Sequence, residues 1–303
     1  MEFEVTILGS SSATPTATRN PSAQILHFRN KFFLIDCGEG TQVRIRQNKI
    51  KYQKIDKIFI SHLHGDHYLG LFGLLCSLNL NNRKNTVEIY APEPLEELIR
   101  LQAKISMVFW GFPIKFIVTN PKEAQLIYED SALEIHSFPL KHRIATTGFI
   151  FKEKPMPRKL NPKMLRDYDI PVYARNQIKY GSDFTTDDGI YLSNKSLTFD
   201  PPSPRSYAYC SDTAYLESVI PHIKGADLLY HETTFLHDMA QRAKFTKHST
   251  TIEAGTIANK ANVKKLIIGH FSARYHKLDP FLEETKTVFE NCELAIENKT
   301  FQI

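Results

Sequence analysis

Short apolar segments separated by turn residues make up most of the chain, and this pattern predicts an α/β domain. In the first half these segments alternate or run apolar and end near Gly, Ser, Asn or Pro, which is typical of β-strands. The expected strands are Glu2–Leu8, Ser22–Phe28, Lys31–Asp36, Ile55–Ser61, Thr86–Ala91, Ile114–Val118, Ala124–Tyr128, Leu133–Phe138 and Thr147–Phe151. Apolar residues at helical spacing predict helices over Gly38–Ile50, Leu69–Leu80 and Pro94–Ile105.

The pattern changes after Phe151. Residues 152–205 are rich in Pro, Lys, Asp, Tyr and Asn and contain no long apolar run, so we expect an insertion outside the core sheet. Strands are expected again at Ser206–Cys210, Ala226–His231 and Lys265–Ile268, and helices at Ala214–Ile223, Thr250–Ala261 and Pro280–Phe289. This order predicts one layered α/β domain over residues 1–303, with 152–205 as a protruding arm.

The distribution of charge singles out part of this insertion. The 303-residue chain has a formal net charge of +5, and the segment from Lys152 to Tyr180 has eight basic and three acidic residues, which also leaves +5. Such a segment predicts contact with a polyanion, because Lys and Arg bind phosphates, although a solvated basic loop is the alternative. The basic residues are Lys152, Lys154, Arg158, Lys159, Lys163, Arg166, Arg175 and Lys179.

Three features favour a soluble cytoplasmic protein with no membrane partner. The first residues, Met1–Gly9, are not a basic stretch followed by an apolar one, as a signal peptide requires. The longest apolar run, around Leu69 to Leu80, is too short to span a bilayer. The four cysteines are far apart and form no C-x-x-C pair, which is typical of a reducing compartment.

The run His62-Leu63-His64-Gly65-Asp66-His67 follows an expected strand and concentrates candidate metal ligands. Zinc accepts neutral imidazole nitrogen and carboxylate oxygen, and a catalytic site leaves a position open for water. Because His62 and His64 alternate while Asp66 and His67 come one turn later, the run predicts two adjacent ions rather than one structural zinc. The alternative is a His-rich surface loop.

Three later residues are candidate partners for this run. His142, Asp212 and His270 each follow the carboxyl end of an expected strand. The loops at that end of a sheet gather functional side chains in α/β folds. Any one of them alone is more often an ordinary loop residue, but three in the same strand-end context as the opening run are harder to explain in that way.

These residues resemble those of the ribonuclease Z family, in its short form, within the metallo-β-lactamase superfamily. The resemblance covers essentially the whole chain, and it implies a four-layer αββα fold. It also implies a zinc-dependent endoribonuclease that cuts the 3′ trailer from precursor tRNA, leaving a 3′-hydroxyl on the tRNA and a 5′-phosphate on the trailer. The further motifs that carry it are Asp36-Cys37-Gly38-Glu39-Gly40-Thr41-Gln42, Ile58–Gly70, His231-Glu232-Thr233-Thr234, His248-Ser249-Thr250 and Ser272-Ala273-Arg274-Tyr275.

The resemblance implies two zinc ions per subunit. One is expected at His62, His64 and His142, the other at Asp66, His67 and His270, with Asp212 bridging both. Two cations about 3.5–4 Å apart polarise a phosphodiester and activate water. His and Asp ligands also suit manganese or iron, so the residues leave the metal's identity open.

Three residues have expected catalytic roles. Asp66 can orient or deprotonate the attacking water as well as bind metal. By resemblance His248 is the general acid that protonates the leaving ribose oxygen, and Glu232 orients it. The alternatives are that His248 only precedes the helix cap at Ser249 and Thr250, and that Glu232 is structural.

The insertion lies where this family carries a flexible arm that grips tRNA away from the cleavage site. The resemblance therefore implies that the eight basic residues contact tRNA, and that two subunits pair so that each arm serves the other subunit. The Leu69–Leu80 helix is a candidate interface element, with core packing as the alternative.

The chain departs from the family pattern in two places. The arm has Pro171 but no Gly-Pro element, which affects its detailed geometry. Ala17 stands where relatives commonly have a basic residue, in a loop expected near the tRNA 3′ end, so discrimination against a CCA-bearing end can differ.

Two other functional interpretations of the sequence are possible besides the ribonuclease. One is a phosphodiesterase or arylsulfatase for small anionic esters on the same fold, which leaves the basic arm without a role. The other is a non-catalytic RNA-binding or scaffold protein on a decayed fold, which the complete ligand set disfavours.

Overall fold

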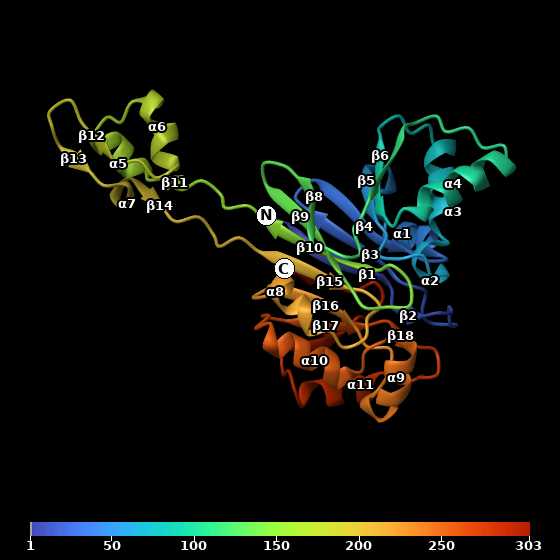
Figure 1. Ribbon diagram of the computed structural model, residues 1–303. Coiled ribbons are helices and arrows are strands. Elements are labelled where there is room, and N and C mark those ends of the chain that lie inside the picture. Colours follow the sequence, from blue (N-terminus) through green and yellow to red (C-terminus); the bar gives the residue numbers. More distant parts are fainter. Residues whose placement is uncertain (1) are drawn as a thin grey trace. The chain divides into compact units, whose positions relative to one another are not determined.

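The computed structural model describes residues 2–303 and divides into two compact units. The larger unit contains residues 2–128, Ile135–Phe151 and Ser206–Ile303 and is built on two seven-stranded sheets (Figure 1). The smaller contains Glu129–Glu134 and Lys152–Arg205.

The first sheet has the order β20-β1-β3-β4-β5-β6-β7. Its strands β4 to β7 are parallel, so the polar residues that follow β4 and β5 emerge at one edge. The bounds are β1 (Phe3–Gly9), β3 (Ala23–Phe28), β4 (Lys31–Cys37), β5 (Ile55–Phe59), β6 (Val87–Ala91), β7 (Ile114–Val118) and β20 (Thr300–Gln302).

The second sheet has the order β19-β17-β16-β15-β10-β9-β8. Strands β15, β16, β17 and β19 are parallel, and the loops after β15, β16 and β17 therefore open on one edge. The bounds are β8 (Gln125–Glu129), β9 (Leu133–Pro139), β10 (Thr147–Glu153), β15 (Ser206–Cys210), β16 (Leu228–Glu232), β17 (Leu266–Gly269) and β19 (Cys292–Leu294).

Aromatic side chains fill the space between the two sheets. Phe59 on β5 lies 5.4 Å from Phe149 and 5.3 Å from Phe151 on β10, measured between ring centroids. Phe33 on β4 lies 5.9 Å from Phe151, and all four rings are buried. These edge and tilted contacts are the favoured geometry of aromatic pairs, so the two sheets pack face to face.

Helices cover the outer face of each sheet. The first sheet packs against α1 (Thr41–Gln47), α3 (Leu71–Leu80) and α4 (Pro94–Ile105), and the second against α8 (Ile220–Ile223), α10 (Thr251–Lys260) and α11 (Asp279–Lys286) (Figure 1). The order helix, sheet, sheet, helix confirms the expected four-layer αββα fold. Outside the layers, β2 (Ser11–Ser12) pairs with β18 (Phe271–Ser272).

One expected helix is largely absent, and another packs in the core. The helix expected over Ala214–Ile223 is wrong, because Leu216 is extended and only a 3-10 turn at Glu217–Val219 and α8 follow it. In α3 the four residues Leu71, Leu74, Leu75 and Leu78 are buried in the core. This helix therefore packs in the core, and Gly73 and Leu80 are its exposed residues.

The smaller unit has a core of its own, although its sequence contains no long apolar run. Ile170, Ala174 and Ile178 are spaced four residues apart and are buried together with Leu192 and Leu197. Single apolar residues at helical spacing are easily overlooked among charged ones. The elements are α5 (Pro162–Asp167), α6 (Val172–Lys179), α7 (Asn194–Leu197) and the pairs β11 (Lys159–Leu160) with β14 (Thr198–Phe199) and β12 (Phe184–Thr185) with β13 (Tyr191–Leu192).

Within residues 2–303, none of the helices has the length and apolar character needed to cross a membrane.

Candidate metal centre

The His62–His67 run leaves the end of β5 and enters the short helix α2 (Gly65–Tyr68). His62 and His67 are fully buried, and His64 is the residue that precedes α2. The run lies between the end of a strand and the start of a helix, and these two elements fix the positions of its polar side chains.

One cluster contains His62, His64, His142 and Asp212, whose ligand atoms all lie within 4.8 Å of one another. Nδ1 of His64 is 3.1 Å from Nε2 of His62 and 3.1 Å from Nε2 of His142. Oδ2 of Asp212 is 3.5 Å from Nε2 of His62. Three imidazoles and one carboxylate therefore point at a common space.

A second cluster contains Asp66, His67 and His270. Nε2 of His270 is 3.3 Å from Nε2 of His67 and 3.3 Å from Oδ2 of Asp66. Oδ1 of Asp212 lies 3.2 Å from Nε2 of His270 and 3.4 Å from Nε2 of His67. The two oxygens of Asp212 thus face different clusters, so the structure brings all seven expected ligands together.

The donor atoms fit divalent cations. Imidazole nitrogens that face each other at 3.1–3.3 Å cannot all carry a proton, so lone pairs point into the clusters and can bind a cation. Oδ1 of Asp212 is buried and makes no hydrogen bond within the described residues. Neutral imidazole and carboxylate groups are ligands of zinc, and they also suit manganese and iron.

The second nitrogen of three histidines is held by a neighbouring group. Nδ1 of His67 is 2.7 Å from Oδ2 of Asp36, Nδ1 of His142 is 2.8 Å from the carbonyl oxygen of Lys247, and Nδ1 of His270 is 2.9 Å from Oγ1 of Thr234. Such contacts fix the tautomer and turn the other nitrogen toward a metal. Sequence reasoning missed these three partners as site residues.

Asp36, at the end of β4, is the most connected of these partners. Its carboxylate accepts hydrogen bonds from the Ser61 backbone amide, the Ser61 hydroxyl and the Tyr209 hydroxyl, at 2.7, 2.9 and 2.7 Å, besides that of His67. Asp36 is completely buried. Its place in the motif Asp36–Gln42 after a strand was the only signal in the sequence.

Four residues around the centre have a left-handed backbone conformation. Ala13, Asp36, Lys247 and His270 have φ angles of 61°, 54°, 57° and 62°. Residues other than Gly rarely adopt this conformation, and strained backbone of this kind clusters at functional sites. At Ala13 the turn lets the backbone amide donate a 2.7 Å hydrogen bond to Oδ2 of Asp66.

Burial and mutual charge determine the protonation of the ligands. Burial lowers the pKa of His62 to about 4, and it also lowers the pKa of His64 and of His142. These three imidazoles are therefore neutral, which is the form that binds metal. Burial opposes ionisation of Asp212, but His270 and His67 outweigh it and hold the pKa of this carboxyl well below its ordinary value.

His248 is paired with Glu232 beside the two clusters. Nδ1 of His248 is 2.9 Å from Oε1 of Glu232 and 3.9 Å from Oδ2 of Asp212. Burial lowers the pKa of His248, but Glu232 and Asp212 outweigh it and raise the pKa to about 9. Within residues 2–303 Nε2 of His248 has no hydrogen bond, and the residue lines the pocket above the clusters.

Glu232 is fully buried, and both of its carboxylate oxygens accept hydrogen bonds. Oε1 also accepts from the amides of Thr213 and Ser249, at 3.1 and 3.0 Å, and Oε2 accepts from Thr234. Two residues after His248, Thr250 caps α10 in a reciprocal box with Glu253. The structure therefore places His248 between a fixed carboxylate and a fixed helix start.

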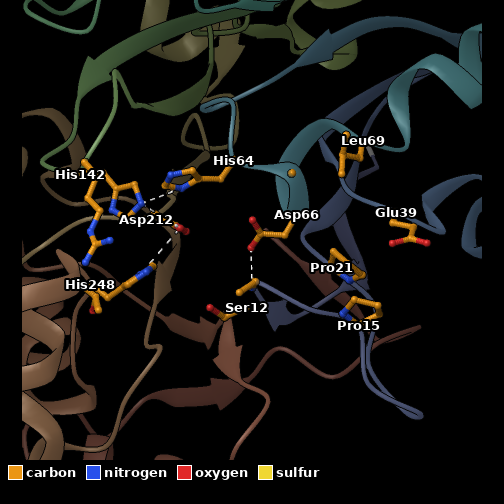
Figure 2. Close-up of a pocket in the computed structure, with 14 residues that line it drawn as sticks. Ser12, Pro15, Pro21, Glu39, His64, Asp66, Leu69, His142, Asp212 and His248 are labelled. Carbon is orange, nitrogen blue, oxygen red and sulfur yellow. Dashed lines mark hydrogen bonds and ion pairs between the residues drawn. The ribbon is translucent and has the colours of Figure 1, made fainter.

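A pocket of about 420 Å³ opens over the clusters. Figure 2 shows His142 and His248 on one side of it and Pro15, Pro21 and Glu39 on the other, with Asp66 between. The opening makes the ligand atoms accessible from solvent.

In the smaller unit the eight basic residues differ in their contacts. Lys154 pairs with Glu129, Arg158 pairs with Asp200, and Arg175 donates to the carbonyl oxygen of Ile170. Lys152 is half-buried. Lys159, Lys163, Arg166 and Lys179 are exposed and make no ion pair within residues 2–303.

The tyrosines of this unit also divide into two kinds. Tyr168 packs against the small core, whereas Tyr173 and Tyr180 are 80% and 73% exposed. Exposed aromatic rings among basic residues are a surface that nucleic acids contact by stacking.

Comparisons with known proteins cover the whole chain. The chain is 44% identical over 302 residues to a ribonuclease Z of Phocaeicola vulgatus, covering 100% of this chain and 98% of that protein. It is 42% identical to a ribonuclease Z of Parabacteroides distasonis, covering 100% and 99%. A family model described as anti-Pycsar protein Apyc1 matches residues 3–154.

Solved structures show the same architecture. The human tRNase Z, short form, aligns with a TM-score of 0.72 and 26% identity, covering 99% of both chains. The metallo-β-lactamase fold protein YhfI from Bacillus subtilis aligns with a TM-score of 0.71 and 18% identity, covering 100% of both chains. The fold is therefore the metallo-β-lactamase fold.

Proposed function

The chain belongs to the ribonuclease Z family, and from this premise we propose that it is the endoribonuclease that removes the 3′ trailer of precursor tRNA. The cut falls just after the discriminator base and leaves a 3′-hydroxyl on the tRNA and a 5′-phosphate on the trailer. The observation that carries this proposal is the full-length match to ribonuclease Z relatives in a chain whose two His/Asp clusters share Asp212.

We propose two zinc ions per subunit as the resident metals. His62, His64 and His142 would hold one and Asp66, His67 and His270 the other, with Asp212 between them. When bound, two such cations polarise the phosphodiester and lower the pKa of water. Support for two sites comes from the opposite directions of the two Asp212 oxygens.

Asp66 orients the attacking water and accepts its proton. Its Oδ2 is fixed by the amide of Ala13 at 2.7 Å and by Nε2 of His270 at 3.3 Å. The residue lines the pocket, so its carboxylate faces the space in which the substrate and the attacking water would bind.

His248 donates a proton to the leaving ribose 3′-oxygen. Glu232 holds Nδ1 of His248 and favours the imidazolium, so Nε2 can deliver a proton into the pocket. Glu232 acts through His248 and is a positioning residue.

The smaller unit is proposed as the tRNA arm. Its exposed cations Lys159, Lys163, Arg166 and Lys179 offer charges for the phosphate backbone, and Tyr173 and Tyr180 offer exposed rings. An ion pair at 2.9 Å joins Glu153 and Arg205, which lie near the two ends of the segment Lys152–Arg205. The other four basic residues are less available because they are paired or half-buried.

We also propose that the protein is a cytoplasmic homodimer. Exposed apolar side chains of α4, Leu98, Leu101 and Ile105, line a surface pocket with Leu69 and support self-association. The four cysteines are free, which supports a reducing compartment. Light scattering of the purified protein tests the dimer.

Deleting residues 155–200 tests the ribonuclease against a phosphodiesterase or arylsulfatase of small esters. The deletion retains Glu153 and Arg205 and leaves the metal clusters intact. A ribonuclease that grips tRNA through the arm loses precursor cleavage and still hydrolyses a small chromogenic diester. Unchanged tRNA cleavage by the deletion variant would contradict the proposed arm.

A further inference from the structure

Phe245 is an exposed aromatic residue at the rim of the metal pocket. It belongs to the last turn of α9 (Ala240–Thr246), and 76% of it is exposed. The residues Thr246 and His248, which follow it closely in the chain, line the pocket. Its ring is therefore exposed to solvent next to residues that line the pocket.

Arg143 connects this ring to the metal ligands. It follows His142, lines the pocket and places its guanidinium carbon 5.5 Å from the centroid of the Phe245 ring. One guanidinium nitrogen also donates to the carbonyl oxygen of Phe245, at 3.4 Å. In the described chain Arg143 forms no ion pair with a carboxylate, unlike Arg44, Arg83 and Arg205.

The two chain segments that carry this pair are basic. The segments 140–146 and 240–248 contain no Asp or Glu, and they supply Lys141, Arg143, Arg242, Lys244 and Lys247. Lys141, Arg242 and Lys244 are exposed. An exposed ring beside unpaired cations matches the two halves of a nucleotide, because a base stacks on an aromatic face and a phosphate binds Arg.

The position of His248 indicates which part of the substrate binds on this side of the pocket. In the proposed reaction His248 protonates the 3′-oxygen that leaves with the tRNA, so the nucleotide carrying that oxygen lies on the side of His248. Figure 2 places His248 and His142 on the same side, opposite Pro15, Pro21 and Glu39. Phe245 precedes His248 by three residues, and Arg143 is the neighbour of His142.

We propose that Phe245 and Arg143 form the subsite for the nucleotide that keeps the 3′-hydroxyl after cleavage. The base stacks on the Phe245 ring, and the guanidinium of Arg143 binds the phosphate on the 5′ side of that nucleotide. This inference rests on the proposed function, since the proposed leaving group determines which nucleotide lies beside His248.

A cycle of enzyme and substrate changes tests the stacking contact. Phe245→Ala is compared with wild type on a precursor tRNA and on the same RNA made abasic at the last retained nucleotide. Either change alone lowers kcat/KM about 10-fold, as loss of one base–aromatic stack does. The abasic change has less than about a twofold effect on Phe245→Ala, because the contact is already lost. Independent effects, which multiply to about 100-fold, would overturn the proposal.

Controls separate stacking from folding. Phe109→Ala removes a ring that is 82% exposed and does not line the metal pocket, and it leaves the abasic effect intact. Phe245→Trp restores stacking and kcat/KM, whereas Phe245→Leu, which keeps an apolar side chain, does not. An abasic change at the first trailer nucleotide, by contrast, lowers the kcat/KM of Phe245→Ala as much as it lowers that of wild type. Full activity of Phe245→Leu would point to a structural role and overturn the proposal.

Arg143 is tested in the same manner. Arg143→Gln lowers kcat/KM on the precursor about 10-fold, as loss of a charged phosphate contact does. Replacing the 5′ phosphate of the retained nucleotide by an uncharged methylphosphonate has little further effect on this variant. An undiminished effect of the methylphosphonate would show that Arg143 does not bind that group.

Binding measurements distinguish a failure of the proposed subsite from a failure of the proposed function. The same cycles are run on dissociation constants, measured by fluorescence anisotropy with labelled RNA. If wild type does not cleave the precursor but the Phe245 and abasic changes still couple in binding, the proposed function fails and the subsite stands. If wild type cleaves and no coupling is seen in either measurement, the subsite fails and the proposed function stands.

Discussion

Nδ1 of His248 lies 2.9 Å from Oε1 of Glu232, and this contact turns the other imidazole nitrogen toward the pocket. Glu232 is itself fixed by the backbone amides of Thr213 and Ser249. A carboxylate in this position both orients the imidazole and stabilises its charge, as in other carboxylate–histidine pairs. The pair is therefore suited to deliver a proton beside the two clusters.

Replacement of His248 by Ala is expected to lower kcat for precursor tRNA about 10²- to 10⁴-fold, the range typical of a general acid. The metal content stays at the wild-type value, because His248 is not among the seven proposed ligands. Single-turnover cleavage and elemental analysis measure these two quantities. His27→Ala is the control, since His27 has a similar side-chain exposure, 18% against 14%, and lies outside the pocket. A kcat within fivefold of wild type for His248→Ala would exclude His248 as the acid.

Asp66→Ala should separate binding from cleavage. The variant keeps its affinity for precursor tRNA within a few fold, because the proposed arm makes most of the contacts with phosphates. Cleavage is lost, since the residue that contacts the attacking water is gone. Affinity is measured by anisotropy and cleavage on gels. Normal cleavage by this variant would contradict the proposed site.

Asp36→Asn tests the carboxylate behind His67. Asn tolerates the left-handed backbone of Asp36, but its amide group cannot accept from His67, Ser61 and Tyr209 as Oδ2 does. Metal affinity is expected to fall about 10- to 100-fold, the usual effect of losing a group that orients a ligand. Competition with a chelator measures it.

Asp227→Asn is the matched control for that experiment. Asp227 accepts from Ser206 one residue before β16, whereas Glu232 and the site lie at the other end of this strand. Its substitution should leave metal affinity unchanged. Equal losses for both variants would indicate a general effect on stability.

Neutralising the exposed cations of the smaller unit should weaken tRNA binding and reduce its dependence on salt. The quadruple variant replaces Lys159, Lys163, Arg166 and Lys179 by Gln. Each phosphate contact contributes about 0.7 to 0.9 to the slope of log affinity against log salt, so the slope falls by about 3 if all four make contact. A variant with Lys49, Lys51, Lys84 and Lys104 replaced makes the same charge change on exposed residues of the larger unit. Equal slopes for the two variants would contradict the proposed arm.

The sequence predicts the layers well because strand ends and helices have strong local signals. His142, Asp212 and His270 follow apolar segments, and parallel strands bring Asp212, Glu232 and His270 to one edge. The three-residue strands β19 and β20 lacked a pattern long enough to predict. Periodicity in α6 predicts its buried face, yet the charged residues around it obscured that signal.

Partners that act through the backbone or across the fold could not be predicted. The carbonyl oxygen of Lys247 holds His142 from 105 residues away, and any residue type supplies a carbonyl. The amide of Ala13 reaches Asp66 only because the loop adopts a left-handed turn. The stack of Arg143 on Phe245 joins segments about 100 residues apart, and neither residue belongs to a motif of the site.

Mapping the cut on a 3′-extended precursor tRNA tests whether the protein is the endoribonuclease that removes the 3′ trailer. Purified metal-loaded protein is incubated with the precursor, with and without chelator, and both product ends are determined to one nucleotide. We expect one chelator-sensitive cut just after the discriminator base, with a 3′-hydroxyl on the tRNA and a 5′-phosphate on the trailer. Absence of cleavage, cleavage that survives the chelator, or a cut elsewhere in the RNA would contradict it.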